Sequence, residues 1–287
     1  MSVGTRPVCW LNACFQVPDD WEITAYSIEP RAGRLEFGTR HGLQGFMSWE
    51  TASRAPDRDV LFSAFPVRPG QTRKEDHFQT AEAGRFTLAW GSESEPCLAV
   101  GFLAGPKKLL RWVFPTAVAA LREGVITPIL ASVEPNGGPF RRWCAFGLDF
   151  RLPAEYQLEH ARIQPADVEL VFESDRRARA IFHRWGLPEA LLRGLSLEAF
   201  YTERLHGAGA RVRDIRRVDV RGMDGVEAAY SQTGEHQMDR FMGRAWTSGQ
   251  GRLWLDRTAK RLLAVEQIGP PNVALPSFES LVGGERG

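Results

Sequence analysis

The chain contains an internal repeat, and this repeat restricts the fold more than any other feature. Residues 15–21 match residues 150–156 at an offset of 135 (150 − 15), with Phe and Pro at the same places in both segments. Five further pairs keep this offset without a gap: Cys9 with Cys144, Ile28 with Ile163, Pro30 with Pro165, Leu35 with Leu170, and Phe37 with Phe172. Self-similarity of this kind indicates repeated structural units. We expect two copies of one domain; the alternative is coincidence of ordinary strand composition.

Later landmarks follow in the same order at changing offsets, which predicts insertions in loops, where extra length costs little closure entropy. They are Trp49 with Trp185 after a one-residue slip, 89–90 with 245–246, 107–110 with 260–263, and Pro128 and Ser132 with Pro276 and Ser280. Residues 134–139, Glu-Pro-Asn-Gly-Gly-Pro, have the composition of a linker. The repeat therefore predicts one domain over 1–138 and a second over 139–287.

Composition fits this division. A chain of 287 residues with 43% hydrophobic and 25% charged side chains is long enough for two ordinary folded domains. Its 36 basic and 35 acidic residues nearly cancel, so it lacks the general attraction that nucleic-acid and anionic-membrane binders usually have. Neither a signal peptide nor an apolar run long enough to span a membrane is apparent. We expect a soluble protein of the cytoplasm.

Each copy is expected to form strands first and a helix later. Alternating residues predict hairpins over 22–37 and 157–172, with a third strand ending at Trp49 or Trp185. Ser196 is a candidate N-cap for a helix that places Leu197, Phe200, Tyr201 and Leu205 on one face, after an earlier turn at Pro188. The expected remainder comprises a two-turn helix at 56–65, strands at 216–220, 226–230, 243–246, 252–255 and 261–267, and closing helices from Pro128 and Pro276. The predicted class is α+β: two tandem copies of an antiparallel sheet packed by helices.

Both copies open with the pattern Phe-x-[Val/Leu]-Pro-x-x-[Trp/Tyr], at 15–21 and 150–156, and both end in a short helix with a serine, Ser132 or Ser280. This arrangement resembles the PsbP/Mog-like family, which joins the photosystem II oxygen-evolving protein PsbP to the Mog-type Ran-binding proteins. The resemblance covers most of each copy and implies the fold alone. No residue of a Ran-binding or manganese-related surface carries over.

The search for chemistry finds no catalytic, cofactor-binding or metal-binding motif. The histidines lack the spacing that presents two imidazoles to one metal, and we expect His77 and His183 to be surface or hydrogen-bonded core residues. Residues 247–251 are expected to form a turn rather than a nucleophile elbow. Residues 101–108 lack the Gly-Lys-Ser/Thr core of a phosphate loop and instead predict a hairpin turn before a strand.

Cysteine and tryptophan are expected to serve the core. Four cysteines, at 9, 14, 97 and 144, are too few for a disulfide framework, so we expect buried, reduced thiols. The tryptophans that recur in both copies, Trp49, Trp90, Trp185 and Trp246, suit packing between sheet and helix. Trp10, Trp112 and Trp254 are less constrained by the repeat and are candidates for the surface.

One local feature favours binding. Arginines are concentrated in the second copy, where they could form a basic surface for phosphates or an acidic protein. The candidate residues are Arg176, Arg177, Arg211, Arg213, Arg216 and Arg217; Arg179, Arg184, Arg204 and Arg221 lie near them in the sequence. The alternative is a solvated sheet face whose arginines pair with Glu169, Glu173 and Asp175.

These observations favour a non-enzymatic binding or adaptor protein that uses the surface of its two domains, or a groove between them, and has a protein partner. One alternative is a hydrolase whose catalytic residues converge from distant loops, for which a deep pocket with two close titratable groups would be the sign. Another is nucleic-acid or acidic-partner binding through the Arg-rich second domain. No cofactor and no membrane contact are expected.

Overall fold

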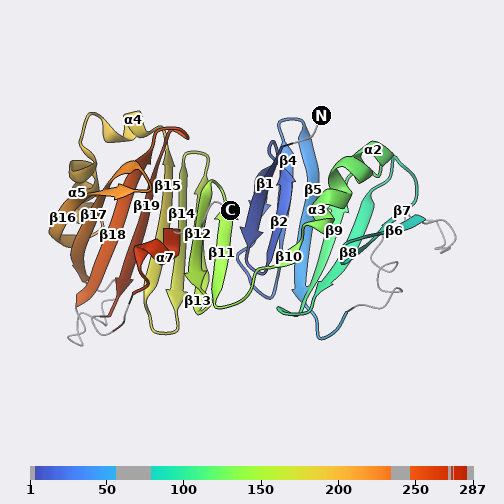
Figure 1. The fold of residues 1–287 in the computed structure, drawn as a ribbon, viewed down its shortest axis with the longest axis horizontal. Helices are drawn as coiled ribbons and strands as arrows, with labels where there is room; N and C mark the ends of the chain where they lie inside the picture. The colour runs from blue at the N-terminus through green and yellow to red at the C-terminus, as the bar shows by residue number, and fades with distance from the viewer. Residues whose placement is uncertain (1–3, 56–78, 234–245, 271–272, 274, 283–287) are drawn as a thin grey trace. The chain divides into compact units, whose positions relative to one another are not determined.

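The structure is a computed structural model that describes residues 4–55, 79–233, 246–270, 273 and 275–282. The chain divides into two compact units, Met1–Ala145 and Phe146–Gly287 (Figure 1). The boundary expected from the sequence lies at residue 138.

The first unit is built on a seven-stranded antiparallel sheet. Its strand order is β3 (Glu22–Tyr26), β4 (Ala32–Thr39), β5 (Gly42–Thr51), β9 (Lys108–Phe114), β8 (Cys97–Leu103), β7 (Phe86–Trp90) and β6 (Gln79–Ala83). Before this sheet, β1 (Thr5–Trp10) pairs with β2 (Ala13–Pro18) and with β11 (Phe140–Ala145), and β2 also pairs with β10 (Glu134–Pro135). Helical turns run from α2 (Ala119–Leu121) through the π-helical η2 (Arg122–Ile126) into α3 (Thr127–Ala131), which packs against β2 and β6.

The second unit has a sheet of the same kind. After β12 (Leu148–Pro153), the order is β13 (Tyr156–Gln164), β14 (Asp167–Ser174), β15 (Arg179–Gly186), β19 (Arg261–Gly269), β18 (Trp246–Asp256), β17 (Met223–Thr233) and β16 (Ala210–Val220). The helices among its described residues are α4 (Pro188–Leu192), α5 (Leu197–Gly207) and α7 (Phe278–Val282). Helix α5 packs against β16, β17 and β18 (Figure 1).

The two sheets have the same strand order when the strands of each are numbered along the chain. Their hairpin turns also match: Leu11 before β2 and Phe146 before β12 have positive φ angles, and so do Lys107 before β9 and Lys260 before β19. Left-handed backbone is uncommon for residues other than Gly. Two turns thus share an uncommon conformation at corresponding places.

The core of each unit contains aromatic rings at matching positions. Phe15 packs edge-to-face on Phe37 with centroids 5.9 Å apart, and Phe150 packs edge-to-face on Phe172 at 5.6 Å. Trp112 extends the first cluster and Phe182 the second. We name the side of each sheet that carries these rings the aromatic face, and the other side the opposite face.

Strands dominate the molecule, so the expected α+β class holds only loosely: both units are antiparallel sheets with few, short helices. The expected helix from Ser196 is confirmed as α5, and the serine hydroxyl accepts a hydrogen bond from Ala199 N, as an N-cap does. The turn at Pro188 and the closing helices are confirmed as α4, α3 and α7. The helix expected at 56–65 lies outside the described residues.

The expected turn at 247–251 is wrong, because these residues lie inside the continuous strand β18. Gly249 and Gly251 indicate a turn when read from the sequence, but in the structure they serve packing inside the strand. A Cβ on Gly249 would overlap the ring of Tyr230, and one on Gly251 would overlap the Tyr201 hydroxyl. The glycines let two buried tyrosine rings approach the sheet closely, which is a use of glycine within strands rather than at their ends. By contrast, the expected hairpin turn before β9 is confirmed.

Trp49 and Trp185, which the repeat aligns, do not occupy equivalent positions in the two sheets. Trp49 shares the aromatic face with Leu35, the pairing partner of Met47, whereas Trp185 lies on the opposite face, toward α5. Side chains alternate along a strand, so the one-residue slip needed for the match reverses the face. Both rings are buried, and Trp10, Trp112 and Trp254, which were candidates for the surface, are buried as well.

The expectation of reduced thiols is wrong for two cysteines, because Cys9 and Cys14 form a disulfide. They face each other across the β1–β2 hairpin, with Cα atoms 4.0 Å apart. Cysteines that lie directly opposite on paired strands are close enough to bond, and apolar neighbours in the sequence do not reveal such pairing. Cys97 and Cys144 carry thiols. Among the described residues, no helix has both the length and the apolar character needed to cross a membrane.

Candidate functional site

The six candidate arginines do not form one surface. Arg176 and Arg177 lie in the turn between β14 and β15, and Arg177 takes a positive φ of 60° there. The other four lie on β16, which is separated from β15 by β19, β18 and β17. Because strands within a sheet are about 4.8 Å apart, the turn and β16 are distant parts of the unit.

Two of the four arginines on β16 are engaged in ion pairs. Arg216 Nη2 lies 2.6 Å from Glu227 Oε1, and Arg217 donates to Glu198 at the start of α5. The hydrogen bond from Arg217 lowers the pKa of Glu198 to about 2. Pairing with neighbours is what the alternative of a solvated face predicts. Arg216 and Arg217 use Glu227 and Glu198 as partners, whereas Arg179, near Arg177 in the sequence, pairs with the expected Glu173 at 2.9 Å.

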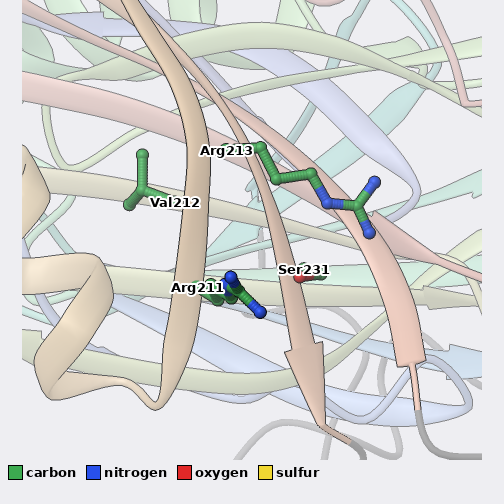
Figure 2. A pocket seen from close by; sticks show the side chains of 4 residues that line it. All are labelled: Arg211, Val212, Arg213 and Ser231. Carbon is green, nitrogen blue, oxygen red and sulfur yellow. The ribbon is translucent and has the colours of Figure 1, made fainter.

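Arg211 and Arg213 differ from these two. They line a surface hollow together with Val212 and Ser231. Figure 2 shows the side chains that line this hollow, with Arg213 extending away from Val212, and with Ser231 on the neighbouring strand. Within the described part of the chain, neither guanidinium has a hydrogen bond or an ion pair.

A β-bulge sets this arrangement. Arg211 pairs with Ser231 and Val212 with Tyr230, but the next pair is Asp214 with Ala229, so Arg213 is the extra residue. A bulge locally redirects side chains and increases twist. Val212 packs against the core under α5, while Arg211 and Arg213 remain exposed.

Strand β16 also ends the sheet. Among the described strands it pairs with β17 alone, so along its outer side half of its backbone N–H and C=O groups face away from the sheet. It has 11 residues, which is long for an edge strand. The candidate site is therefore this edge with its two exposed arginines.

A second group of polar side chains, missed by sequence reasoning, lies beneath α5, with two of its members buried. His183 on β15 is 2% exposed and Glu266 on β19 is 7% exposed. Glu169 Oε2 lies 3.5 Å from His183 Nδ1, and Glu266 Oε1 lies 3.8 Å from His183 Nε2. Arg204 reaches in from α5, with its Nη2 3.2 Å from the imidazole nitrogens. We name these four residues the buried polar cluster.

Aromatic rings enclose this cluster. The His183 imidazole stacks on Trp185 with centroids 4.8 Å apart, and the Arg204 guanidinium lies 4.4 Å from the centre of the same indole ring. Tyr201 on α5 and Tyr230 on β17 are buried beside Glu266, and burial together with the charge of Glu266 raises the pKa of both hydroxyls well above the ordinary value. Such stacking is favourable for a cation above an indole ring.

The enclosure changes the proton affinity of the cluster. Burial, and then the charges of Arg204 and Arg162, lower the pKa of His183 well below its ordinary value of 6.5. Burial raises the pKa of Glu266, and Arg204 opposes this rise. The imidazole is therefore neutral at pH 7. Among the described residues, no group of three or more His, Cys, Asp or Glu side chains could hold a metal ion.

One signal for this cluster was present in the sequence. Glu266 follows an apolar run, 262–265, in a predicted strand, and a carboxylate in such a strand is rarely buried without a partner. The partner could not be read from the sequence, because β15 and β19 come together only through the fold. His183 is a core residue with polar partners, one of the two roles expected for it.

No family model and no curated protein matches the chain. Solved structures do resemble it. PsbP (CyanoP) from Synechocystis matches 47% of this chain and 84% of its own length, with 14% identity and a TM-score of 0.36. The T6SS immunity protein TplEi from Pseudomonas aeruginosa matches 97% of this chain and 95% of its own, with 15% identity and a TM-score of 0.36. The same protein complexed with an "L" peptide has a TM-score of 0.32, with 15% identity over 98% of this chain and 94% of its own. PsbP, to which the sequence pattern was compared, is thus among the similar structures, at a TM-score of 0.36. We take no function from these likenesses.

Proposed function

We propose that this chain is a non-enzymatic binding protein whose second unit takes an extended, acidic segment of a partner protein along β16. The observation that carries the proposal is the pair of exposed guanidinium groups on Arg211 and Arg213, which lack partners among the described residues and lie beside a hollow on a strand that ends its sheet. A segment added to an edge strand gains main-chain hydrogen bonds, and alternate side chains supply specificity. Carboxylates are the groups that arginine forks bind best.

We further propose that the two units arose by duplication and that the protein acts in the cytoplasm. The common strand order and the matched left-handed turns support the duplication. In this proposal the first unit keeps the shared framework, and the second unit carries the binding edge.

Fluorescence anisotropy would test the binding proposal. The probe is a labelled peptide of about 10 residues with alternating Glu and Val, a length that matches a long strand. We expect the double variant Arg211→Glu with Arg213→Glu to weaken binding at least about tenfold, because each lost Arg–carboxylate pair costs a charge-assisted hydrogen bond. The matched control is Arg176→Glu with Arg177→Glu, which makes the same change of charge at the distant turn and should leave the affinity unchanged.

Three results would count against the proposal. These are absence of peptide binding, equal losses in both double variants, and tighter binding of a single-stranded oligonucleotide with a steep fall in affinity as salt rises. The last result would favour the nucleic-acid alternative, since release of counterions makes such binding strongly salt-dependent.

The hydrolase alternative has one observation in its favour, the close pair of His183 and Glu266. We rank it second because both side chains are buried under α5, so a substrate could reach them only if that helix moved. Turnover of a chromogenic ester that is lost in His183→Ser, with peptide binding unchanged, would reverse this ranking.

A further inference from the structure

Three cysteines lie in one row across neighbouring strands of the first unit. Strand β1 pairs with β2 on one side and with β11 on the other, and Cys9 is directly opposite Cys14 in the first pair and Cys144 in the second. Side chains directly opposite each other on antiparallel strands lie on the same face, with Cβ atoms about 4.5–5.5 Å apart. Cys9 therefore has a cysteine neighbour on each side.

The packing around this row is dense. Trp10 and Trp143 meet edge-to-face across β1 and β11, with ring centroids 5.6 Å apart. The Asn136 side chain donates to the carbonyls of Leu11 and Arg142 and accepts from Arg142 N, joining the β1–β2 turn to β11. The Cys144 thiol lies 3.4 Å from the Pro7 carbonyl oxygen. These contacts hold β11 against β1.

We propose that Cys144, Cys9 and Cys14 form a thiol–disulfide exchange site in which the Cys9 sulfur bonds to either neighbour. In the exchange, Cys144 gives its proton to solvent, and its thiolate attacks the Cys9 sulfur of the Cys9–Cys14 bond. The Cys9–Cys144 bond forms as the Cys9–Cys14 bond breaks, and Cys14 leaves as a thiolate that takes a proton from solvent. One disulfide and one thiol are present before and after, so no external oxidant or reductant is consumed.

The positions of the three sulfurs suit this direction of attack. Cys9 is buried, whereas Cys14 and Cys144 are only partly buried, so the attacking and the leaving thiol are the two that solvent reaches. Strands β2 and β11 flank β1 on opposite sides, which puts Cys14 and Cys144 about two strand spacings, or ~10 Å, apart. They are too distant to bond directly. Cys9 is therefore the obligatory centre of the exchange.

The two bonded forms differ in what they connect. The Cys9–Cys14 bond closes a hairpin with a sequence separation of 5, whereas a Cys9–Cys144 bond ties β1 to β11 and closes a loop of nearly half the chain. A cross-link that closes a long loop restricts the unfolded chain more than one that closes a short loop. The exchange would thus fasten or release the strand β11.

Cys97 provides an internal control. It lies buried on β8, away from the row, and burial raises the pKa of its thiol to about 11. A thiol with such a pKa reacts slowly, because the thiolate is the reactive form. Protection of Cys97 from alkylation therefore reports that a variant is folded.

The test uses the full chain equilibrated in glutathione redox buffers, quenched with acid, alkylated, and digested with chymotrypsin, which separates Cys9 from Cys14 by cutting after Trp10 and Leu11. Mass spectrometry then identifies the linked peptides. We expect Cys14→Ser to form the Cys9–Cys144 bond, and Cys9→Ser to form about tenfold less of a Cys14–Cys144 bond or none. The wild type should contain both Cys9 bonds.

The proposal fails if Cys14→Ser, with Cys97 still protected, leaves Cys9 and Cys144 fully alkylated in buffers that oxidise the wild-type Cys9–Cys14 pair. It also fails if Cys9→Ser links Cys14 to Cys144 as readily as Cys14→Ser links Cys9 to Cys144. If a variant exposes Cys97 and is therefore not folded, the test rests on the two Cys9 bonds of the wild type. Absence of the Cys9–Cys144 bond from the wild type at every ratio of reduced to oxidised glutathione would then contradict the proposed exchange.

Discussion

The two sheets are alike on their aromatic faces and unlike on their opposite faces. On the aromatic faces, Phe37 and Phe172 hold corresponding places and make the same edge-to-face contacts. On the opposite faces, the pairing of Ser48 with Arg111 in β5 and β9 corresponds to that of His183 with Ala264 in β15 and β19. The shared face maintains the fold, and the other face is where the units differ in chemistry.

The difference is one of burial as much as of residue type. The first unit has an ion pair on its opposite face, Arg111 Nη2 to Glu50 Oε1 at 2.7 Å, in which the arginine is about as exposed as Arg204 but the glutamate is 45% exposed. The position of Val113 in the first sheet corresponds to that of the buried Glu266 in the second. Arg204 lies close to both Glu266 and His183. Burial under α5 turns an ordinary set of charges into one with altered pKa values.

The largest effects should come from the shared face. We expect Phe37→Ala and Phe172→Ala each to lower the free energy of unfolding by about 3–5 kcal/mol, because each leaves a cavity in a packed aromatic cluster. Urea unfolding followed by circular dichroism would measure both. A loss below about 1 kcal/mol in one unit, with a large loss in the other, would break the equivalence of the two aromatic faces.

The opposite faces should respond unequally to loss of an arginine. Arg204→Met leaves Glu266 buried without its cation and removes the stacking on Trp185, so we expect a loss of about 2–3 kcal/mol, less than for a fully buried pair because Arg204 is partly exposed. Arg111→Met in the first unit is the matched change, and exposed ion pairs are worth at most about 1 kcal/mol. Equal losses in urea unfolding would show that burial under α5 does not strengthen the cluster.

The sequence predicted the shared face better than the opposite face, for a physical reason. Phe15, Phe37, Phe150 and Phe172 lie close to the repeated opening pattern, so local alternation and one constant offset place them together. His183 and Glu266 meet only because β15 pairs with β19 in a particular register, and register is a property of the sheet. Strand register therefore cannot be read from a local sequence pattern.

The same limit explains two other outcomes. Arg177 and Arg211 looked like members of one surface because strand order could not be read from the sequence, and three strands lie between β15 and β16. Trp49 and Trp185 aligned by residue type, but the one-residue slip placed them on different faces. The arginine pair at β16 kept its predicted exposure because it depends on a single strand.

The pH dependence of stability should also separate the units. The pKa of His183 is lowered in the folded state, so below about pH 6.5 the unfolded chain binds a proton that the folded chain does not. Stability should therefore fall as pH drops from 7.5 to 5.5, by up to about 1.4 kcal/mol per pH unit. The groups that face the imidazole are Glu169, Glu266, Arg204 and, farther off, Arg162.

Two variants sharpen this prediction. His183→Ser, which installs the residue found at the matched position 48, should remove the fall in stability. Glu266→Gln should steepen it, because the pKa of Glu266 is raised in the folded state and its protonation stabilises the fold as pH drops. Urea midpoints at several pH values would measure both slopes. An unchanged slope in His183→Ser would assign the titration to another group.

The smallest effect concerns the helix that creates the difference between the faces. Ser196 Oγ accepts a hydrogen bond from Ala199 N at 3.2 Å, at the start of α5, whereas α3 in the first unit has no side-chain cap. We expect Ser196→Ala to cost about 1 kcal/mol in urea unfolding, and Ser196→Asp, which keeps an acceptor, to restore most of it. Because α5 covers His183, a weakened cap should also let solvent reach the imidazole more often and bring its pKa, measured by NMR titration, closer to the ordinary value. If stability falls while that pKa stays fixed, the first turn of α5 frays independently of the part that covers the cluster, and Arg204 alone keeps the imidazole enclosed.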